Sequence, residues 1–402
     1  MSIPVEIEKL VYGGQGLGRF DGRVVLAPFV LPGERVRVEP EKESSHLITA
    51  RTIAVETPAV WRTPAPCPYF GICGGCHYQH MPYERQLEAK RAILLETLAR
   101  LGKIEWSGPL EIIAAEPWAY RNRVQLRVRK QAGRFQIGYF EFGSHRLCPV
   151  EHCPISSPGI NKALAALARI GKARRFPDFV QAIELFTNER EVQLNVLESS
   201  RPVARRFFDW CAAEIEGFCR SDFLDYPAGP DIYRVSSRSF FQVNRFLASR
   251  LAEIAAGGER GNTAVDLYAG VGLFSLSLAR QFSRAVANDS NRSACLDLVY
   301  NAERAGVAIE VQQAPADQFL EGFTEKIDFL LADPPRAGLG NAVTASIARL
   351  RPRRLTIVSC DPSTLARDLM RLLAAGFKII SMKIVDLFPQ TFHIETVVTL
   401  AG

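Results

Sequence analysis

The sequence predicts an α/β protein of three parts: an N-terminal β-barrel, an α+β central domain and a C-terminal doubly wound sheet. Residues 1–57 contain short apolar strands separated by glycine and proline, which is typical of a small OB-type barrel. Residues 58–230 mix strands with helices, whereas strand and helix alternate regularly through residues 231–402. Regular alternation predicts a mostly parallel, Rossmann-like sheet with helices on both faces.

The barrel strands are expected at residues 5–7, 22–26, 34–39 and 47–55. The glycine-rich segment Gly13–Gly18 resembles a phosphate-binding loop, but no strong strand precedes it and a strand, not a helix, follows. We therefore interpret this segment as a turn or bulge between two barrel strands.

Charge and composition favour a nucleic-acid partner. The net charge is +6, and arginines cluster at residues 121–129, 201–206 and 349–354. In the first cluster they alternate with apolar residues, which predicts a basic stripe over an apolar face. Any one cluster also fits ordinary solvated surface, but three of them make RNA or DNA a serious candidate.

Cysteine usage indicates a reducing compartment. There are nine cysteines, and the N-terminus lacks the basic and apolar regions of a secretory signal. Apolar runs are too short for a membrane span. We therefore expect a cytoplasmic protein with no membrane partner and no obligate protein partner, and with metal-binding or catalytic roles for some cysteines.

One cysteine group has the spacing of a metal site. Its close members are Cys67, Cys73 and Cys76. Cys153 is a distant fourth ligand in a Cys₄ set, with Cys148 as a nearby competitor. Spacing alone allows zinc or a 4Fe-4S cluster, and it leaves His77 and His80 as rival ligands.

A nucleotide-type site is expected where a strand, a glycine turn and a helix succeed one another at residues 263–280. Ser275 replaces the third glycine of the dinucleotide fingerprint, and no Walker lysine follows. This pattern favours a ligand with one nucleoside and no phosphates, such as S-adenosylmethionine, over a purely structural turn. Asp289 ends the next strand, where a carboxylate can hold a ribose diol. Asp317 follows the third strand region.

Two further residues are expected at the same edge of the sheet as Asp266 and Asp289. Asp333 follows a strand and precedes two prolines, and Cys360 follows the buried strand at residues 356–358. We expect Ser363 to cap the helix after Cys360, whose N-terminus would favour a thiolate. On position alone, Cys360 fits a nucleophile or a structural cysteine equally well. Glu395, among apolar residues, is either an outward-facing strand residue or a functional carboxylate.

Together these segments resemble, over essentially the whole chain, the S-adenosylmethionine-dependent RNA uracil-5-methyltransferases with a TRAM domain and a 4Fe-4S cluster. The matching motifs are Cys67-x5-Cys73-Gly-Gly-Cys76, Tyr120-Arg-Asn-Arg123, Cys153-Pro-Ile, Phe240-Phe-Gln-Val-Asn244, Asp266-Leu-Tyr-Ala-Gly-Val-Gly272, Asp333-Pro-Pro-Arg336, Ser359-Cys-Asp-Pro362 and His393-Ile-Glu-Thr396.

The resemblance implies a role for each matching residue. Cys360 is implied to be the nucleophile and Glu395 the general base. The implied ligands of the methyl donor are Gln242, Tyr268, Asp289 and Asp333, with Asp317 as a looser match. The implied cluster ligands are Cys67, Cys73, Cys76 and Cys153. Leu273 stands where some members have asparagine, so that donor contact is not carried over.

The chemistry explains why a thiol and a carboxylate are both needed. Uracil C5 is a poor nucleophile, and a thiolate that adds to C6 makes C5 able to attack the sulfonium methyl group. A base must then remove the C5 proton so that the thiolate can leave. Large-subunit (23S) ribosomal RNA is the favoured substrate and transfer RNA the alternative, because relatives without barrel and cluster tend to act on transfer RNA. A noncatalytic RNA-binding iron–sulfur or redox-sensing protein is an alternative of another class. A small-molecule methyltransferase would need neither barrel nor basic stripe.

Overall fold

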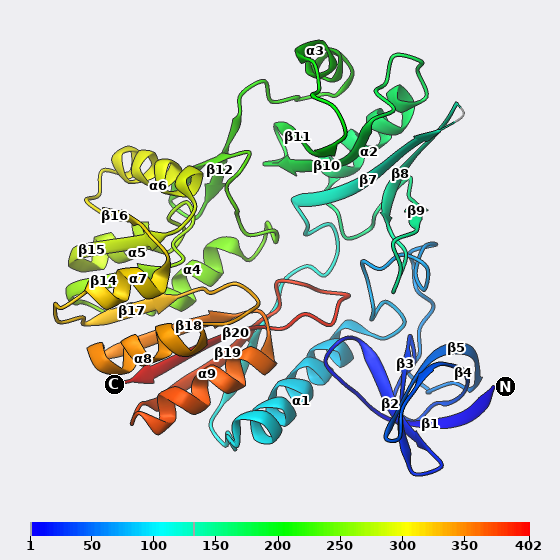
Figure 1. Cartoon of the computed structure of the whole chain (residues 1–402), viewed down its shortest axis with the longest axis horizontal. Helices are drawn as coiled ribbons and strands as arrows, with labels where there is room; N and C mark the ends of the chain where they lie inside the picture. Colours follow the sequence, from blue (N-terminus) through cyan, green and yellow to red (C-terminus); the bar gives the residue numbers. More distant parts are fainter. Residues whose placement is uncertain (1, 132) are drawn as a thin grey trace.

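The computed structural model describes residues 2–131 and 133–402, and its N-terminal part is a closed barrel (Figure 1). The strands pair in the order β1-β2-β3-β5-β4 and are β1 (Ile3–Leu10), β2 (Gln15–Phe20), β3 (Arg23–Pro28), β4 (Arg35–Glu43) and β5 (Leu47–Thr57). Alternate apolar residues, among them Val5, Val25 and Val38, point into one small core. Gly18 is required by packing, because a Cβ there would lie 2.3 Å from the carbonyl oxygen of Glu6.

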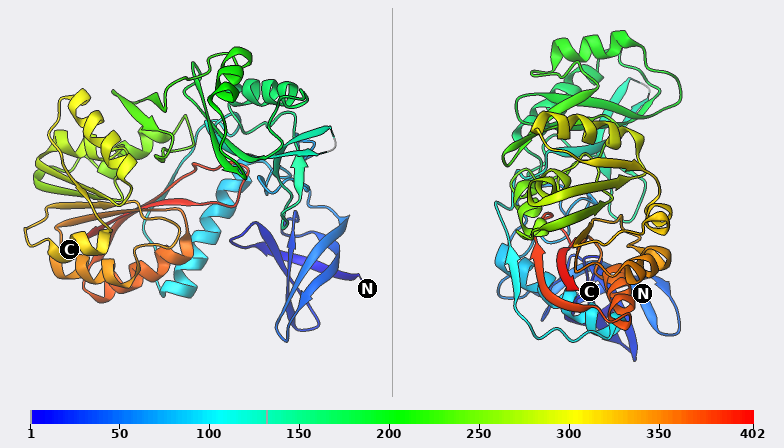
Figure 2. Two further views of the ribbon diagram at one scale, coloured as in Figure 1. Left: turned by 45° about the horizontal axis from the view of Figure 1, so that its top comes forward. Right: turned by 90° about the vertical axis from the view of Figure 1, so that its left-hand side faces the viewer.

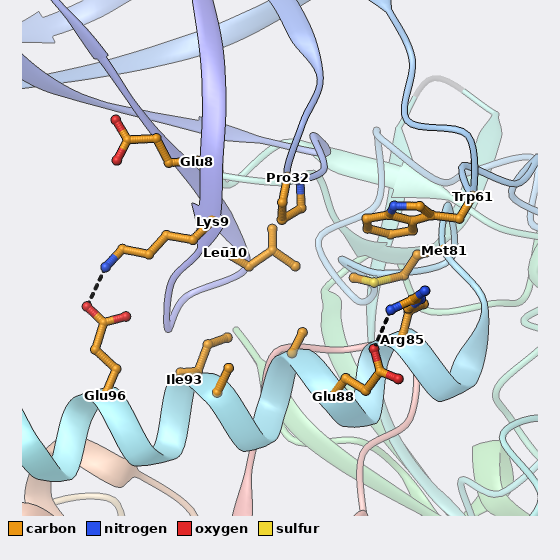
Figure 3. Close-up of a pocket in the computed structure, with 12 residues that line it drawn as sticks. Glu8, Lys9, Leu10, Pro32, Trp61, Met81, Arg85, Glu88, Ile93 and Glu96 are labelled. Carbon is orange, nitrogen blue, oxygen red and sulfur yellow. Dashed lines mark hydrogen bonds and ion pairs between the residues drawn. The ribbon is translucent and has the colours of Figure 1, made fainter.

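The barrel rests against helix α1 (Tyr83–Gly102), with a groove of about 310 Å³ between them (Figure 3). Leu10 from the barrel and Ile93 from the helix line the apolar part of this groove. At one end Lys9 donates to Glu96 at 2.5 Å. The barrel is therefore held on α1 by apolar contact and by an ion pair.

The central antiparallel sheet has the order β11-β10-β7-β8-β9. Its strands are β7 (Arg123–Gln131), β8 (Arg134–Phe140), β9 (Leu147–Pro149), β10 (Val180–Thr187) and β11 (Val192–Ser199), covered by α2 (Pro158–Gly171) and α3 (Arg205–Glu214). Val124 and Leu126 are buried under α2, whereas Arg127 and Arg129 alternate with them on the opposite face. The predicted alternation of arginines with apolar residues is confirmed, but the arginine face is partly neutralised, because Arg123 pairs with Glu184 at 2.7 Å and Arg127 pairs with Glu198.

The C-terminal sheet has the order β16-β15-β14-β17-β18-β20-β19-β6, and β16 to β18 run parallel. Its strands are β6 (Leu110–Ile113), β14 (Gly261–Leu267), β15 (Phe282–Asp289), β16 (Glu310–Gln313), β17 (Phe329–Ala332), β18 (Arg354–Ser359), β19 (Lys378–Val385) and β20 (Glu395–Ala401). Its helices are α4 (Ala248–Ala256), α5 (Ser275–Gln281), α6 (Arg292–Ala305), α7 (Ala316–Gly322), α8 (Gly340–Leu350) and α9 (Pro362–Ala374). β20 inserts antiparallel between β18 and β19. The doubly wound α/β architecture is confirmed.

Two elements outside the expected range 231–402 complete this sheet. β6 pairs in parallel with β19 at the sheet edge, and α1 packs against α9. A hairpin of β12 (Phe223–Ala228) and β13 (Asp231–Ser236) packs against α6. The segment around residues 83–113 therefore belongs structurally to the C-terminal sheet, although the sequence division places it in the central part.

The arginines at residues 349–354, expected as part of a nucleic-acid surface, contact other parts of the protein instead. Arg349 donates to the carbonyl oxygen of Leu320 at 2.6 Å, and Arg351 to that of Ala375 at 3.0 Å. Arg354 begins β18 at the end opposite Cys360. These arginines therefore connect loops at the end of the sheet opposite Cys360. Within the described ranges, no helix has the length and apolarity needed to cross a membrane.

Candidate active site

A cavity of about 1350 Å³ lies where the carboxyl ends of the sheet strands meet β7 and the cysteine segment. In Figure 2, the segment that precedes β20 reaches from the sheet toward this junction. The expected residues that line the cavity are Gln242, Tyr268, Asp289, Asp333, Cys360, Glu395, Cys67, Cys73, Cys76 and Cys153. Asp317 is not among the lining residues; it is exposed in the first turn of α7. Burial raises the pKa of Tyr268, and the charge of Asp317 adds a smaller contribution.

The glycine turn after β14 is shaped around Asp289. Tyr268 and Gly270 adopt left-handed φ angles of 61° and 56°. For tyrosine this conformation is uncommon, and such strain concentrates at functional sites. The Gly270 amide donates to Asp289 Oδ2 at 2.8 Å, and the Asn291 amide donates to Asp289 Oδ1 at 2.7 Å. The carboxylate is thereby fixed at the end of β15, facing the cavity.

Asp266 supports this turn from beneath. It is 1% exposed, and the Ser275 hydroxyl donates to it. Burial raises the pKa of Asp266 to about 8, and the Ser275 hydrogen bond opposes that rise. The serine at the third fingerprint position is therefore a partner of Asp266.

The surroundings of Cys360 differ from the expectation in two ways. Asp361, not Ser363, caps α9, because its Oδ1 accepts from the Ser363 amide at 2.8 Å and the Thr364 amide at 3.1 Å. Burial, with smaller contributions from carboxylates including Glu395, raises the pKa of the Cys360 thiol to about 12. In these buried surroundings Cys360 is therefore expected as a neutral thiol near pH 7, contrary to the expected thiolate.

Two carboxyl groups share the surroundings of Cys360. Glu395 begins β20 and is 5% exposed; burial, with a smaller contribution from Asp333, raises its pKa well above the usual range. Burial also raises the pKa of Asp333 to about 7. Gln242 Nε2 donates to Asp333 Oδ2 at 3.4 Å. Burial disfavours the negative forms of Asp333, Glu395 and Cys360. A positively charged ligand bound among them would stabilise these negative forms, and they would in turn stabilise the ligand.

Sequence reasoning gave no role to three residues that surround these acids. The positive charge of Arg336 opposes the rise that burial causes in the pKa of Cys360, and its Nη2 lies 3.0 Å from Nδ1 of His393. Tyr12, from the turn between β1 and β2, donates to the carbonyl oxygen of Cys360 at 3.2 Å. Arg336 ends the motif that Asp333 begins, and His393 begins the motif that contains Glu395. Their closeness in sequence to these two residues could therefore have indicated a place in the site. Tyr12 carries no such signal.

The cysteine segment faces the same cavity. Cys67, Cys73, Cys76 and Cys153 all line it, whereas Cys148 does not and is only 3% exposed in β9. Burial is the main cause that raises the pKa of Cys73 to about 12, and the nearby thiols add to it. The Gly75 amide donates to Cys73 Sγ at 3.4 Å. Among the residues that the structure describes, no three histidine, cysteine or acidic side chains converge closely enough to hold one ion.

The rival histidine ligands lie among aromatic side chains. His77 packs edge-on against Phe392 with ring centroids 4.7 Å apart, and His80 lies 5.2 Å from Phe70. Burial lowers the pKa of His77 to about 4 and that of His80 to about 3, so both are neutral near pH 7.

Comparisons with known proteins agree with this geometry. A family model described as tRNA (Uracil-5-)-methyltransferase matches residues 228–402, and a TRAM domain model matches residues 2–45. An uncharacterised RNA methyltransferase of Aquifex aeolicus is 31% identical, over 99% of this chain and 98% of its own. The 23S rRNA (uracil(1939)-C(5))-methyltransferase RlmD of Alkalilimnicola ehrlichii is 30% identical, over 98% of this chain and 95% of its own.

A solved structure shares the fold over the full length. The Pyrococcus abyssi tRNA (uracil-54, C5)-methyltransferase, in complex with S-adenosyl-L-homocysteine, superposes with a TM-score of 0.78 at 24% identity. The alignment covers 99% of this chain and 100% of that one. Since relatives at 30–31% identity match nearly the whole chain, this protein belongs to the RNA uracil-5-methyltransferase family and carries an N-terminal TRAM domain.

Proposed function

We propose that Cys360 attacks C6 of a uracil in RNA and that Glu395 removes the C5 proton after methyl transfer. Addition of the thiolate forms the sulfur–carbon bond and moves electron density to C5, which takes the methyl group from the sulfonium of S-adenosylmethionine. Glu395 then accepts the C5 proton, the double bond re-forms, and the thiolate leaves. The observation that carries the proposal is the convergence of Cys360, Glu395 and Asp333 in one cavity beside the glycine turn.

The methyl donor is assigned to Gln242, Tyr268, Asp289 and Asp333. Asp289 stands where the ribose diol would be held, and Asp333 lies close enough to Cys360 to raise the pKa of the thiol. When bound, the positively charged sulfonium would lower the pKa values of Cys360, Asp333 and Glu395, and so would favour the thiolate and the ionised carboxyl groups. Asp317, outside the cavity lining, is at most a peripheral member of this set.

The test uses Cys360→Ala, Glu395→Gln and a matched thiol control, Cys211→Ala, in the core of the central domain. Cys360→Ala should abolish methyl transfer while RNA and S-adenosylmethionine binding stay within about twofold. Glu395→Gln should accumulate a covalent protein–RNA complex, because the C5 proton is no longer removed. Cys211→Ala should keep the wild-type rate. An unchanged rate in Cys360→Ala would exclude this cysteine as the nucleophile.

A 4Fe-4S cluster is assigned to Cys67, Cys73, Cys76 and Cys153. A zinc ion would need all its sulfurs about 2.3 Å from one point, whereas a cubane binds each thiolate at a separate iron and accepts wider spacing. The Gly75 amide that donates to Cys73 Sγ fits thiolate ligation. When bound, the cluster would cross-link the cysteine segment to the loop that carries Cys153.

Iron and zinc analysis together with visible absorbance tests the cluster. Cys153→Ser should lose iron and the charge-transfer absorbance, while Cys148→Ser should keep both, because Cys148 lies outside the cavity lining. Stoichiometric zinc without iron in the wild-type protein would contradict the assignment.

The RNA substrate is assigned to 23S ribosomal RNA in the cytoplasm, with transfer RNA as the alternative. Full-length similarity to a protein named for 23S rRNA uracil methylation supports the first. Full-length similarity in fold to a tRNA methyltransferase supports transfer RNA as the alternative substrate. Undermodified total RNA labelled from methyl-tritiated S-adenosylmethionine distinguishes them, and label confined to transfer RNA would overturn the ribosomal assignment.

A further inference from the structure

The turn between β1 and β2 places one barrel side chain against both catalytic loops. The Tyr12 hydroxyl donates to the Cys360 carbonyl oxygen at 3.2 Å. The Tyr12 ring meets Phe392 edge-on, with centroids 5.4 Å apart and planes at 90°. Phe392 lies three residues before Glu395. Tyr12 therefore contacts the peptide unit of the nucleophile and the segment that leads to the base.

The turn itself is docked on the same aromatic group. Gly14 has a φ of 83°, and a Cβ there would lie 2.9 Å from the His77 ring, so the backbone approaches His77 closely. His77 packs against Phe392, and its amide donates to the Gln390 carbonyl oxygen at 2.8 Å. The glycines of this segment thus allow the barrel backbone to lie close to the catalytic loops, and this contact holds Tyr12 in place.

The Tyr12 hydroxyl remains a hydrogen-bond donor throughout the working pH range. Burial, followed by the charge of Asp361, raises the pKa of Tyr12 far above its ordinary value. The hydroxyl therefore stays protonated near neutral pH and can donate to the Cys360 carbonyl oxygen, with the Asp361 carboxylate as a second acceptor beside it.

We propose that Tyr12 is a positioning residue, which lets the TRAM barrel set the orientation of Cys360 relative to Glu395. The proposal rests on the roles assigned to Cys360 and Glu395 above. It makes the barrel part of the catalytic geometry, in addition to any grip that it has on RNA. The hydrogen bond from Tyr12 holds the Cys360 carbonyl group in one orientation. The backbone that carries Cys360 Sγ is thereby fixed, so the thiol is aligned for attack on C6.

Tyr12→Phe removes the hydroxyl and keeps the ring. Loss of one neutral hydrogen bond should lower kcat about fivefold, with the dissociation constants for RNA and S-adenosylmethionine within about twofold of wild type. Covalent capture of 5-fluorouridine RNA should slow by the same factor, because it also requires attack by Cys360. Tyr12→Ala, which loses the contact with Phe392 as well, should be slower still. Tyr300→Phe on the exposed face of α6 is the matched control and should keep the wild-type rate.

Rates are normalised to the protein fraction that binds S-adenosylmethionine, so that partial unfolding does not count as lost catalysis. The same fold-change is expected at every pH between about 6 and 9. An unchanged kcat in Tyr12→Phe, or weaker RNA binding at an unchanged rate, would overturn the positioning role. A change in the shape of the pH profile would do so too, because Tyr12 would then be an acid. Covalent capture by Cys360→Ala would instead overturn the nucleophile assignment.

Discussion

Replacement of Lys90 by methionine should destabilise the protein severely. Lys90 Nζ donates to Asp386 Oδ1 at 2.5 Å and to the Phe388 carbonyl oxygen at 2.8 Å, and both ionic side chains are at most 1% exposed. Without Lys90, Asp386 would keep the Tyr83 hydroxyl at 2.8 Å. A buried charge left without its partner costs about 3–5 kcal/mol. That loss is the expected fall in the free energy of unfolding.

Lys9→Met is the matched control, because Lys9 and Glu96 also lie 2.5 Å apart but are 41% and 32% exposed. An exposed pair contributes about 0–1 kcal/mol, so burial accounts for the expected difference between the two variants. Urea unfolding measures the loss in free energy of unfolding for both variants, provided that their denaturant slopes are equal. The double replacement of Lys90 by methionine and Asp386 by leucine should recover part of the loss, since no lone charge remains.

An equal, small loss for Lys90→Met and Lys9→Met would refute this reasoning. It would mean that water reaches the Lys90–Asp386 pair, so that the pair behaves as a surface one. The loop from Asp386 toward Glu395 would then have to be held by other contacts. One such contact is Gln86 Nε2, which donates to Gln390 Oε1 at 2.9 Å.

Two further variants test the turn and the thiol. Gly14→Ala should unfold at lower urea than Gly13→Ala, because both positions have positive φ but only the Cβ at Gly14 would meet His77, at 2.9 Å; equal midpoints would show that the turn is not docked there. Alkylation of Cys360 by iodoacetamide, measured by mass spectrometry, should rise about tenfold per pH unit from pH 7, because only the thiolate reacts and the pKa is about 12. Above the pH at which the buried Glu395 ionises, Glu395→Gln removes a negative charge that raises this pKa and should speed the reaction. A plateau near neutral pH would show that the thiol is already ionised.

The sheet and its active edge could be predicted because they follow from local patterns. Parallel strands end at one edge, so side chains directly after consecutive strands must gather there. Asp289 ends β15, and Asp333 and Cys360 directly follow β17 and β18, so all three lie on that edge of the sheet. The barrel followed from alternating short strands between glycines and prolines.

The remaining features depend on contacts between distant segments. The pKa of Cys360 is raised by its burial and by Glu395, which begins the neighbouring strand β20 and lies 35 residues away in the sequence, so no local pattern contains this contact. Asp361 and Ser363 can both cap a helix, and only the position of Pro362 within α9 decides between them. Tyr12 lies far from Cys360 in the sequence, and its neighbours indicate nothing more than a turn.

β6 gives the chain an unusual order of assembly during synthesis. This strand emerges from the ribosome early, yet its partner β19 is made only after the whole central sheet and helices α4 to α9. At roughly 5–20 residues per second, that delay lasts tens of seconds. Over this time the apolar edge around Leu110 and the face of α1 that receives α9 stay open to chaperones or to misassembly. A fragment that begins at residue 231 would lack β6, so the edge of β19 that pairs with β6 would be uncovered.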